Sequence, residues 1–281
     1  MTTTATTRTV GLDELRRAWH AVEEGQFLSP RPLDRGTIPR PTEPPVVDDR
    51  VWRPGETVLP VVGCLPQAGV TSLALAIATH ATPARVIECS LPIASGLVGA
   101  ATAELGATSS GWTVGRRDQV HLARPSALHR SARELPLPDD AAAGTVLSVL
   151  DIGWNLGQLL ASDGWLSAAV DAAPQVVVAG TATVPGLRRL ESALTLLDPA
   201  RTVVAMRGGP DPRRWPRELA TAMGPATRDQ HRTGRWVGIP HDRRFALRGI
   251  DSNPLPSALV AAAGDVLRHV GAAGHPPKGT S

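Results

Sequence analysis

The sequence predicts a three-layer α/β sandwich, in which a mostly parallel sheet is covered by helices on both faces. Seven short apolar runs lack the polar alternation of half-exposed strands, which is typical of strands that are buried on both faces. Ala- and Leu-rich helical stretches separate most of these runs, as right-handed crossover connections require. The 281 residues, 42% of them hydrophobic, can form one large domain with appendages.

Strands and helices alternate along the chain from residue 56 onward. The apolar runs predict strands at 57–63 (TVLPVVG), 84–89 (ARVIEC), 119–123 (QVHLA), 145–151 (TVLSVLD), 175–180 (QVVVAG), 201–206 (RTVVAM) and 234–239 (GRWVGI). The intervening stretches predict helices at 71–80, 95–105, 155–172, 186–197, 214–223 and 256–270. Because ligands of such sheets bind at the carboxyl ends of the strands, the residues that follow each strand are the first candidates for a site.

Three segments outside this pattern complete the expected domain organisation. Residues 1–26 read as a Thr-rich tail and a short helix, and residues 27–55 read as a Pro-rich linker. Proline at that density prevents both helix and central strand, so the linker is expected to be extended. The folded domain is expected over residues 56–271, and a disordered tail is expected over residues 272–281.

The chain contains almost no lysine. Of its 29 basic residues only Lys278 is a lysine, and the other 28 are arginines. The bias fits the GC-rich genome of a bacterium, such as an actinobacterium. It also excludes Schiff-base catalysis and the usual phosphate-loop lysine from the expected domain. The net charge of +3 does not by itself indicate nucleic-acid binding.

A glycine-containing loop follows the first expected strand, in the segment VLPVVGCLPQAGVTSLALAIATHA. Gly63 and Gly69 turn the chain, and Thr71 and Ser72 open an apolar helix. This order of strand, loop and helix places backbone N–H groups and a helix N-terminus where they form an anion site. In a working phosphate loop a lysine precedes the Ser/Thr pair, but Val70 stands at that position here.

The loop resembles the deviant Walker A motif, K-G-G-x-G-K-[ST]-[ST], of the ParA/MinD group of P-loop ATPases. Gly69 matches the final glycine, and Thr71 and Ser72 match the hydroxyl pair. Leu65 and Val70 stand where the motif has its two lysines. The resemblance therefore implies a P-loop NTPase-like fold, and the loss of both cations implies that hydrolysis is absent or very slow.

Later segments resemble the same family in the same order. ARVIECSLP is similar to the second strand of the family, with Glu88 and Ser90 at its two aspartate positions. Asp151 stands at the aspartate of the switch segment, and Pro240 and Asp242 match the turn beside the adenine. Together these segments span most of the chain, so the resemblance supports the predicted fold.

The resemblance also implies a set of site residues. The residues implied to bind the nucleotide are Gly69, Val70, Thr71, Ser72, Pro240 and Asp242. Those implied to bind magnesium are Thr71 and Asp151. The implied cofactor is ATP or ADP with magnesium, and the alternative is that none binds. From the residues alone, the glycine and the hydroxyl pair fit a helix cap equally well, and Asp151 could cap the helix that follows it.

Only an arginine could replace the missing lysines as a cation. The candidates are Arg116, Arg117, Arg207, Arg243 and Arg244, and the alternative for each is a solvated side chain. The histidines and the two cysteines, Cys64 and Cys89, lack paired spacing, so no structural metal is expected.

We expect a ParA/MinD-like pseudo-ATPase, without catalytic residues, that acts as a positioning, partition or regulatory protein. Two alternatives are a protein-interaction scaffold that binds no nucleotide and an active NTPase that uses an arginine. A protein partner is expected on residues 12–54, a homodimer is permitted, and DNA binding has no convincing basic cluster behind it. Without an apolar run of about 18 residues or a secretory signal, a cytoplasmic protein is expected, which a partner could recruit to membrane or nucleoid.

Overall fold

The computed structural model describes residues 20, 51–91, 96–208 and 212–272. The chain divides into two compact units, Met1–Pro45 and Val46–Ser281. In the first unit only His20 is described, as an exposed residue in helical conformation. The rest of the predicted tail and helix, most of the predicted linker and nearly all of the C-terminal tail lie outside the described residues. The architecture below is that of the second unit.

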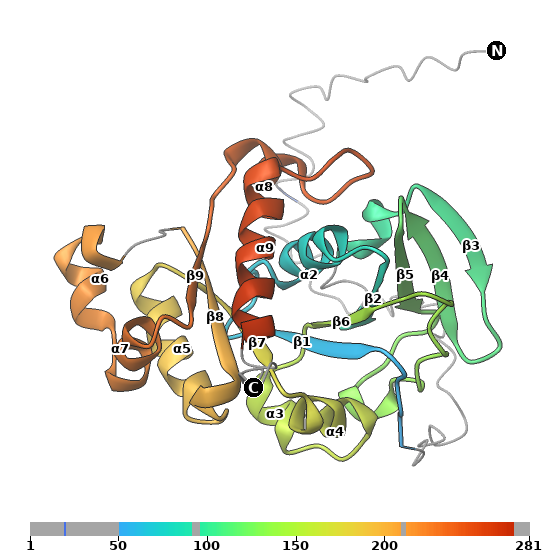
Figure 1. The fold of residues 1–281 in the computed structure, drawn as a ribbon, viewed down its shortest axis with the longest axis horizontal. Helices are drawn as coiled ribbons and strands as arrows, with labels where there is room; N and C mark the ends of the chain where they lie inside the picture. The colour runs from blue at the N-terminus through green and yellow to red at the C-terminus, as the bar shows by residue number, and fades with distance from the viewer. Residues whose placement is uncertain (1–19, 21–50, 92–95, 209–211, 273–281) are drawn as a thin grey trace, which may run out of the picture. The chain divides into compact units, whose positions relative to one another are not determined.

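A nine-stranded sheet runs through the described part of the second unit (Figure 1). Its strands are β1 (Thr57–Gly63), β2 (Ala84–Cys89), β3 (Ala103–Ala107), β4 (Trp112–Arg117), β5 (Val120–Pro125), β6 (Leu147–Ile152), β7 (Val176–Thr181), β8 (Thr202–Arg207) and β9 (Trp236–Ile239). They lie in the order β3-β4-β5-β2-β6-β1-β7-β8-β9. Pairing is parallel from β5 to β9 and antiparallel between β3, β4 and β5 at one edge. The mostly parallel α/β fold is therefore confirmed.

Helices cover both faces of the sheet. They are α2 (Val70–His80), α3 (Leu156–Leu160), α4 (Trp165–Ala172), α5 (Val184–Leu194), α6 (Arg217–Ala222), α7 (Pro225–Arg232), α8 (Arg243–Arg248) and α9 (Ser257–Ala272), with the 3-10 turns η1 (Leu97–Ala100), η2 (Ala132–Glu134), η3 (Pro199–Arg201) and η4 (Pro212–Arg214). One apolar cluster joins α2 and α9 to the sheet, and a second joins α3, α4 and α5 to it. Neighbouring residues such as Val61 and Val62 of β1 belong to opposite clusters, because successive strand side chains point to opposite faces. None of the described helices is long and apolar enough to cross a membrane.

The predicted helix at 95–105 is wrong. Its described part forms only η1 and then the edge strand β3. The N–H of Thr102 donates to the carbonyl of Arg116 at 2.8 Å, which begins the pairing with β4. A Cβ on Gly99 would lie 2.6 Å from the carbonyl oxygen of Ile250, so this turn needs glycine. Antiparallel pairing with the next strand, β4, outweighs the local helical composition.

The predicted helix at 155–172 is two helices, α3 and α4, joined by residues 161–164. Gly164 has a φ of 132°, in a region that favours glycine, and it ends the connection. The indole N–H of Trp165 donates to the carbonyl of Leu135 at 3.0 Å. The break lets α4 begin where this buried tryptophan packs.

The predicted helix at 214–223 begins late, because Pro216 occupies the N-cap of α6. The sequence pattern also missed α7, which starts after Gly224. The carboxylate of Glu191 caps α7 by accepting from the N–H of Thr227 at 2.8 Å. A Cβ on Gly224, the N-cap residue of α7, would lie 2.2 Å from that carboxyl carbon, so the approach of Glu191 from α5 requires glycine here.

Candidate functional site

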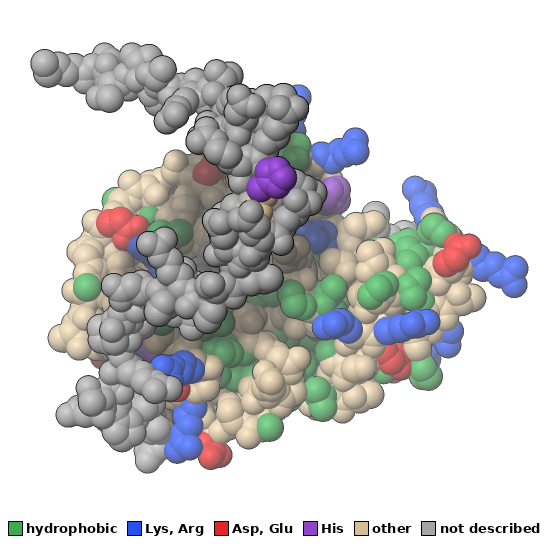
Figure 2. All heavy atoms as spheres, turned by 180° about the vertical axis from the view of Figure 1, so that it is seen from behind, with side chains coloured by type: hydrophobic (Ala, Val, Ile, Leu, Met, Phe, Trp, Pro, Cys, Tyr) green, Lys and Arg blue, Asp and Glu red, His purple; other side chains and the backbone are tan. Residues whose placement is uncertain are grey.

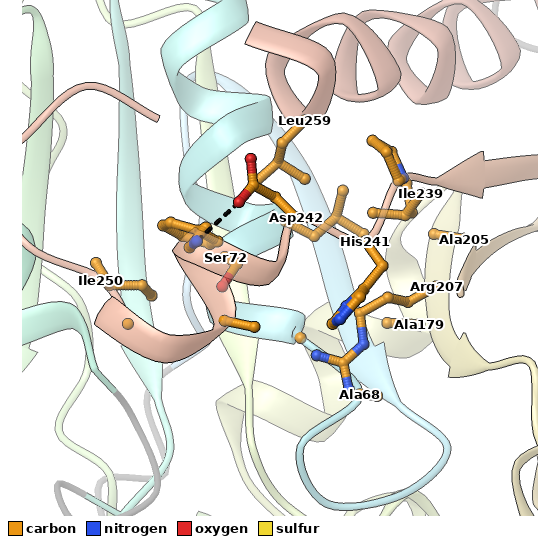
Figure 3. A pocket seen from close by; sticks show the side chains of 16 residues that line it. Ala68, Ser72, Ala179, Ala205, Arg207, Ile239, His241, Asp242, Ile250 and Leu259 are labelled. Atoms are coloured by element: carbon orange, nitrogen blue, oxygen red, sulfur yellow. Dashed lines mark hydrogen bonds between the residues drawn. The ribbon is translucent and has the colours of Figure 1, made fainter. Parts of the chain in front are cut away.

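Two adjoining cavities lie at the carboxyl edge of the sheet. The larger, about 630 Å³, follows the loop at 63–72 and reaches Ser90 and Asp151 at the ends of β2 and β6. The smaller, about 180 Å³, lies between α2, the ends of β8 and β9, α8 and α9 (Figure 3). Gly69 and Arg207 line both cavities, so one elongated ligand could occupy the two together.

The loop after β1 has the backbone that an anion site needs. Gly69 has a φ of 91° and a ψ of 27°, a left-handed conformation, and it is the N-cap of α2. It has no side chain that could accept hydrogen bonds from the first-turn N–H groups. A Cβ on Gly63 would lie 3.0 Å from Val70 Cγ2, so the start of the loop is tight. The first turn of α2 is therefore open to an anion in the larger cavity.

Arg207 lies where the two cavities meet. It is the last residue of β8, and its Nη2 donates to the carbonyl of Gln67 at 2.9 Å. A Cβ on Gly69 would be 3.9 Å from its Nη1, so the guanidinium lies beside the N-terminus of α2. In Figure 3 its side chain lies near His241 and Ala68, at the edge of the smaller cavity. A fixed cation beside a helix N-terminus favours a polyanion.

The other four arginine candidates lie elsewhere. Arg116 is half-buried on the hairpin and bonds to Gln119 at 3.2 Å, and Arg117 is 3% exposed and bonds to backbone carbonyls. Arg243 and Arg244 are exposed on α8, and neither lines one of the two cavities. Of the candidates, Arg207 alone lines these cavities.

Sequence reasoning missed a second cation, Arg189. This exposed residue of α5 lines the larger cavity. Burial raises the pKa of the Cys64 thiol to about 12, although the positive charge of Arg189 acts in the opposite direction. The signal that could have found Arg189 is its place in the helix that follows a parallel strand, at the edge where ligands bind.

Two acidic side chains end β2 and β6 side by side. Asp151 is 1% exposed and lines the larger cavity, as Thr71 does. Glu88 is 4% exposed and is the register partner of Asp151. Burial, together with the negative charges of Asp151 and Glu88, raises the pKa of the Cys89 thiol well above its usual range. A carboxylate and a hydroxyl at one cavity are oxygen donors of the kind that magnesium prefers.

Asp151 does not cap the following helix. The N-cap of α3 is Asn155, whose side chain accepts from the N–H of Gln158 at 3.2 Å. The nearby hydroxyl of Ser90 is buried and has no hydrogen-bond partner among the described residues. A Cβ on Gly153 would lie 2.5 Å from Ser90 Cβ, so β2 and the end of β6 meet closely here.

The smaller cavity has mainly apolar walls. Leu73, Ala179, Ala205, Ile239, Ile250 and Leu259 are among the residues that line it. Pro240 and Asp242 also line it. Asp242 is the N-cap of α8, since its Oδ1 accepts from the N–H of Phe245 at 2.8 Å (Figure 3). An apolar cavity with few polar groups suits a flat, weakly polar group such as a nucleobase.

The structure thus brings the predicted loop residues and Asp151 to one cavity, and Pro240 and Asp242 to the adjoining one. Cys64 and Cys89 are free thiols. Among the described residues, no group of three His, Cys, Asp or Glu side chains could hold a metal ion.

Comparisons with known proteins find similar folds. No family model matches the chain, and no curated protein matches it either. Similar solved structures include MinD complexed with Mg-ADP from Pyrococcus horikoshii, with a TM-score of 0.48, 13% identity, and coverage of 78% of this chain and 98% of that one. A McdA–ATP complex from Cyanothece has a TM-score of 0.46, 11% identity, and coverage of 78% and 98%. MinD from Aquifex aeolicus has a TM-score of 0.43, 14% identity, and coverage of 75% and 97%. At these identities the likeness concerns the fold and transfers no residue role.

Proposed function

We propose that this chain binds ATP or ADP with magnesium, hydrolyses it very slowly or not at all, and acts as a ParA/MinD-like positioning, partition or regulatory protein. The observation that carries the proposal is the pair of joined cavities at the carboxyl edge of the sheet. One has a helix N-terminus, a cation and a carboxylate for phosphates and magnesium. The other is apolar and suits the base.

Phosphates would lie in the larger cavity, against the first turn of α2 formed by Val70, Thr71 and Ser72. A helix N-terminus contributes about 0.3 to 2 kcal/mol to an anion. A charge-assisted hydrogen bond from Arg207 would add about 1.5 to 3 kcal/mol. Thr71 and Asp151 would hold magnesium, whose charge would offset that of the phosphates.

Hydrolysis should be slow, because Leu65 and Val70 stand where the family has lysines. Cations that stabilise the transferring phosphoryl group are worth on the order of 10³ to 10⁵ in rate. The guanidinium of Arg207 already donates to the carbonyl of Gln67, and its planar fork cannot follow the path of a lysine between phosphates.

A second candidate function, an active NTPase that uses arginine, is favoured by Arg207 and Arg189 at the same cavity. Arg207→Met separates the two candidates. In the binding-only protein it weakens nucleotide binding, and no turnover exists to be lost. In the active enzyme it abolishes turnover while some binding persists.

Calorimetry with ATP, ADP and GTP, with and without magnesium, tests the proposal alongside phosphate release. We expect saturable binding of an adenine nucleotide, and a rise of several degrees in the thermal midpoint at ligand concentrations well above the Kd. Thr71→Ala should weaken magnesium-dependent binding. Thr79→Ala is the matched control, because its hydroxyl bonds within α2 to the carbonyl of Leu75. Absence of binding would leave the interaction scaffold as the function.

The domain and partner assignments belong to the same proposal. The folded domain would span residues 56–271, and a protein partner would bind residues 12–54, most of which lie outside the described residues. Deletion of residues 1–50 should abolish partner binding while the thermal midpoint of the domain stays unchanged. A homodimer and recruitment from the cytoplasm to membrane or nucleoid also fit the proposal, and sedimentation with and without nucleotide tests the dimer.

DNA binding has little support. Figure 2 shows one face of the molecule. Among the described residues of that face, basic side chains are dispersed among acidic and apolar ones and form no single patch. Sequence-independent DNA binding depends on gathered positive charge and weakens steeply with salt. We expect no DNA binding, and a salt-sensitive shift of DNA in a gel at low micromolar protein would contradict that expectation.

A further inference from the structure

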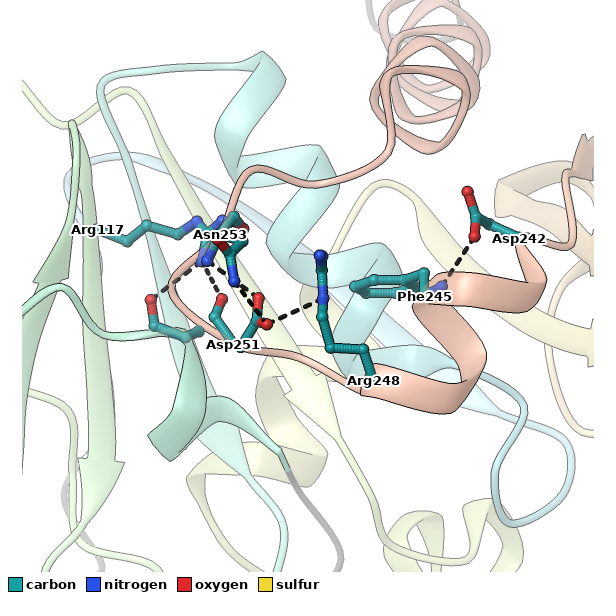
Figure 4. Close-up of polar contacts among 7 residues, drawn as sticks. Arg117, Asp242, Phe245, Arg248, Asp251 and Asn253 are labelled. Atoms are coloured by element: carbon teal, nitrogen blue, oxygen red, sulfur yellow. Dashed lines mark hydrogen bonds and ion pairs between the residues drawn. The ribbon is translucent and has the colours of Figure 1, made fainter.

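Arg117 has a buried guanidinium that bonds to the backbone of other segments (Figure 4). It is the last residue of β4 and is 3% exposed. Its Nη1 donates to the carbonyl oxygens of Ala100 at 3.1 Å and Asp251 at 2.6 Å, and its Nη2 donates to the carbonyl of Asn253. Burial lowers the pKa of Arg117, but an arginine stays charged at neutral pH. One charged group therefore ties three carbonyls together.

The segment that Arg117 holds, residues 249–253, is the loop after α8. Asp251 organises it by accepting from Arg248 Nε at 2.9 Å and from the N–H of Asn253 at 3.0 Å (Figure 4). On its other side the loop lies against η1, where a Cβ on Gly99 would be 2.6 Å from the carbonyl oxygen of Ile250. The loop is thus held between the edge hairpin and η1.

Ile250 connects this loop to the proposed nucleotide site, because it lines both cavities of that site. No residue of β3, β4 or β5 lines either cavity. The hairpin therefore meets the site through Arg117 and the loop. Removing the guanidinium would take its hydrogen bonds from the buried carbonyl of Ala100 and from the carbonyls of Asp251 and Asn253 in the loop. Without these bonds the loop loses its tie to β4, and a shift of the loop would carry Ile250 with it.

We infer that Arg117 is a positioning residue for the nucleotide site, which it shapes by holding Ile250 as the wall common to the two cavities. The inference rests on the proposed function for the identity of the ligand. The antiparallel edge of the sheet, whose strands line neither cavity, would thus contribute to ligand binding through Arg117.

A double-mutant cycle separates this role from a general contribution to stability. If Arg117 acts through Ile250, the effects of Arg117→Lys and Ile250→Ala on binding will not add. We expect each single variant to weaken ADP binding about tenfold, equivalent to about 1.4 kcal/mol, and the double variant to weaken it no further. Arg116→Lys, on the same strand but outside the loop contacts, should bind ADP as the wild type does.

Three results would overturn the inference: additive losses in the double variant, unchanged ADP binding in Arg117→Lys, or an equal loss in Arg116→Lys. If Arg117→Lys does not fold, Asp251→Ala loosens the same loop from its own side, and the same cycle with Ile250→Ala applies. Urea unfolding of each variant shows how much of any loss of ADP binding comes from a lower stability of the fold.

Hydrogen exchange provides a readout that needs no nucleotide. In Arg117→Lys the amides of residues 250–253 should exchange about tenfold faster or more, while those of β1 and β7 keep wild-type rates. If the wild type binds no nucleotide, the proposed function fails, and exchange alone decides whether Arg117 positions the loop. Unchanged exchange would overturn the inference whether or not nucleotide binds.

Discussion

The two ends of the central parallel strands use arginine in opposite ways. At the amino ends, Arg85 of β2 donates to Glu56 Oε1 and to Ser148 Oγ, each at 2.6 Å. The side chains of Arg85 and Glu56 are 7% and 5% exposed. At the carboxyl ends, Arg207 of β8 is half-buried, donates to the carbonyl of Gln67 and faces two cavities.

The difference teaches how to separate a structural charge from a functional one. The guanidinium of Arg85 also donates to the carbonyl of Asp139 at 2.6 Å and lies 5.9 Å from the ring centroid of Trp52. Protein groups therefore match it on several sides, and its role is to hold the start of β1 and β6 to β2. The guanidinium of Arg207 borders open volume, so a ligand can still match it.

The largest expected effect comes from Arg85→Met. It leaves the buried carboxylate of Glu56 without its cation, and breaking a buried pair costs about 3 to 5 kcal/mol. Urea unfolding should show this loss in the free energy of unfolding. Arg116→Met, at a less buried position, should change it by less than about 0.5 kcal/mol. A loss below about 1 kcal/mol for Arg85→Met would break the comparison.

Arg207→Met should act on binding instead of stability. Loss of a charge-assisted hydrogen bond to phosphate should weaken ADP binding about 10- to 100-fold, or about 1.4 to 2.8 kcal/mol, by calorimetry. The free energy of unfolding should stay within about 0.5 kcal/mol of the wild type. Arg243→Met, exposed and outside both cavities, should leave ADP binding unchanged. Equal losses of binding in both variants would mean that Arg207 acts only through net charge.

Low pH should reduce the stability that Glu56 contributes at the amino ends of the central strands. Burial alone would raise the pKa of Glu56, but the Ser148 hydroxyl and the Arg85 charge outweigh it and lower the pKa below its usual range. A carboxyl whose pKa is lower in the folded state stabilises the fold above its unfolded pKa of about 4.3, and that contribution is lost as pH falls through the folded value.

The stability gap between wild type and Glu56→Gln should therefore be larger at pH 7 than at about pH 3, by urea unfolding. Glu218→Gln, at an exposed position on α6, serves as the control and should show no such dependence. A gap that does not change with pH would show that Glu56 contributes through packing alone.

The smallest effect is expected from Arg232→Ala. Arg232 pairs with Asp229 on α7, and their side chains are 79% and 51% exposed. Exposed pairs of this kind contribute about 0 to 1 kcal/mol, so stability should fall by less than about 0.5 kcal/mol and ADP binding should not change. A loss above 1 kcal/mol would show that surface arginines are also structural, which would blur the comparison.

Local pattern predicted the parallel part of the fold well. The strands β1, β2, β6, β7 and β8 consist mainly of apolar residues without regular polar alternation, and most of their consecutive residues are buried. The antiparallel edge was not readable in this way. Strand β3 is exposed throughout, and its pairing depends on β4, which follows a turn. Composition there favoured a helix, and the pairing overrode it.

The candidate site was predictable where topology alone places residues. Thr71 lies after β1 and Asp151 lies near the end of the neighbouring parallel strand β6, and the carboxyl ends of these strands meet at one edge, so their shared cavity could be expected. The arginines could not be sorted in that way. Arg117 and Arg207 both end strands and look alike in the sequence, yet one is enclosed by the loop after α8 and the other borders open volume.

The sequence by itself determined that no lysine lies in the loop at 63–72, because Leu65 and Val70 stand at the two positions where the resemblance expects lysines. It also determined the glycine and the hydroxyls of that loop. Only the tertiary structure decided which cations, Arg207 and Arg189, line the larger cavity. Arg207 and its partner Gln67 are 140 residues apart in the chain. The order of β1, β7 and β8 in the sheet brings them together. That order follows from the burial of the whole sheet, and no short stretch of sequence specifies it.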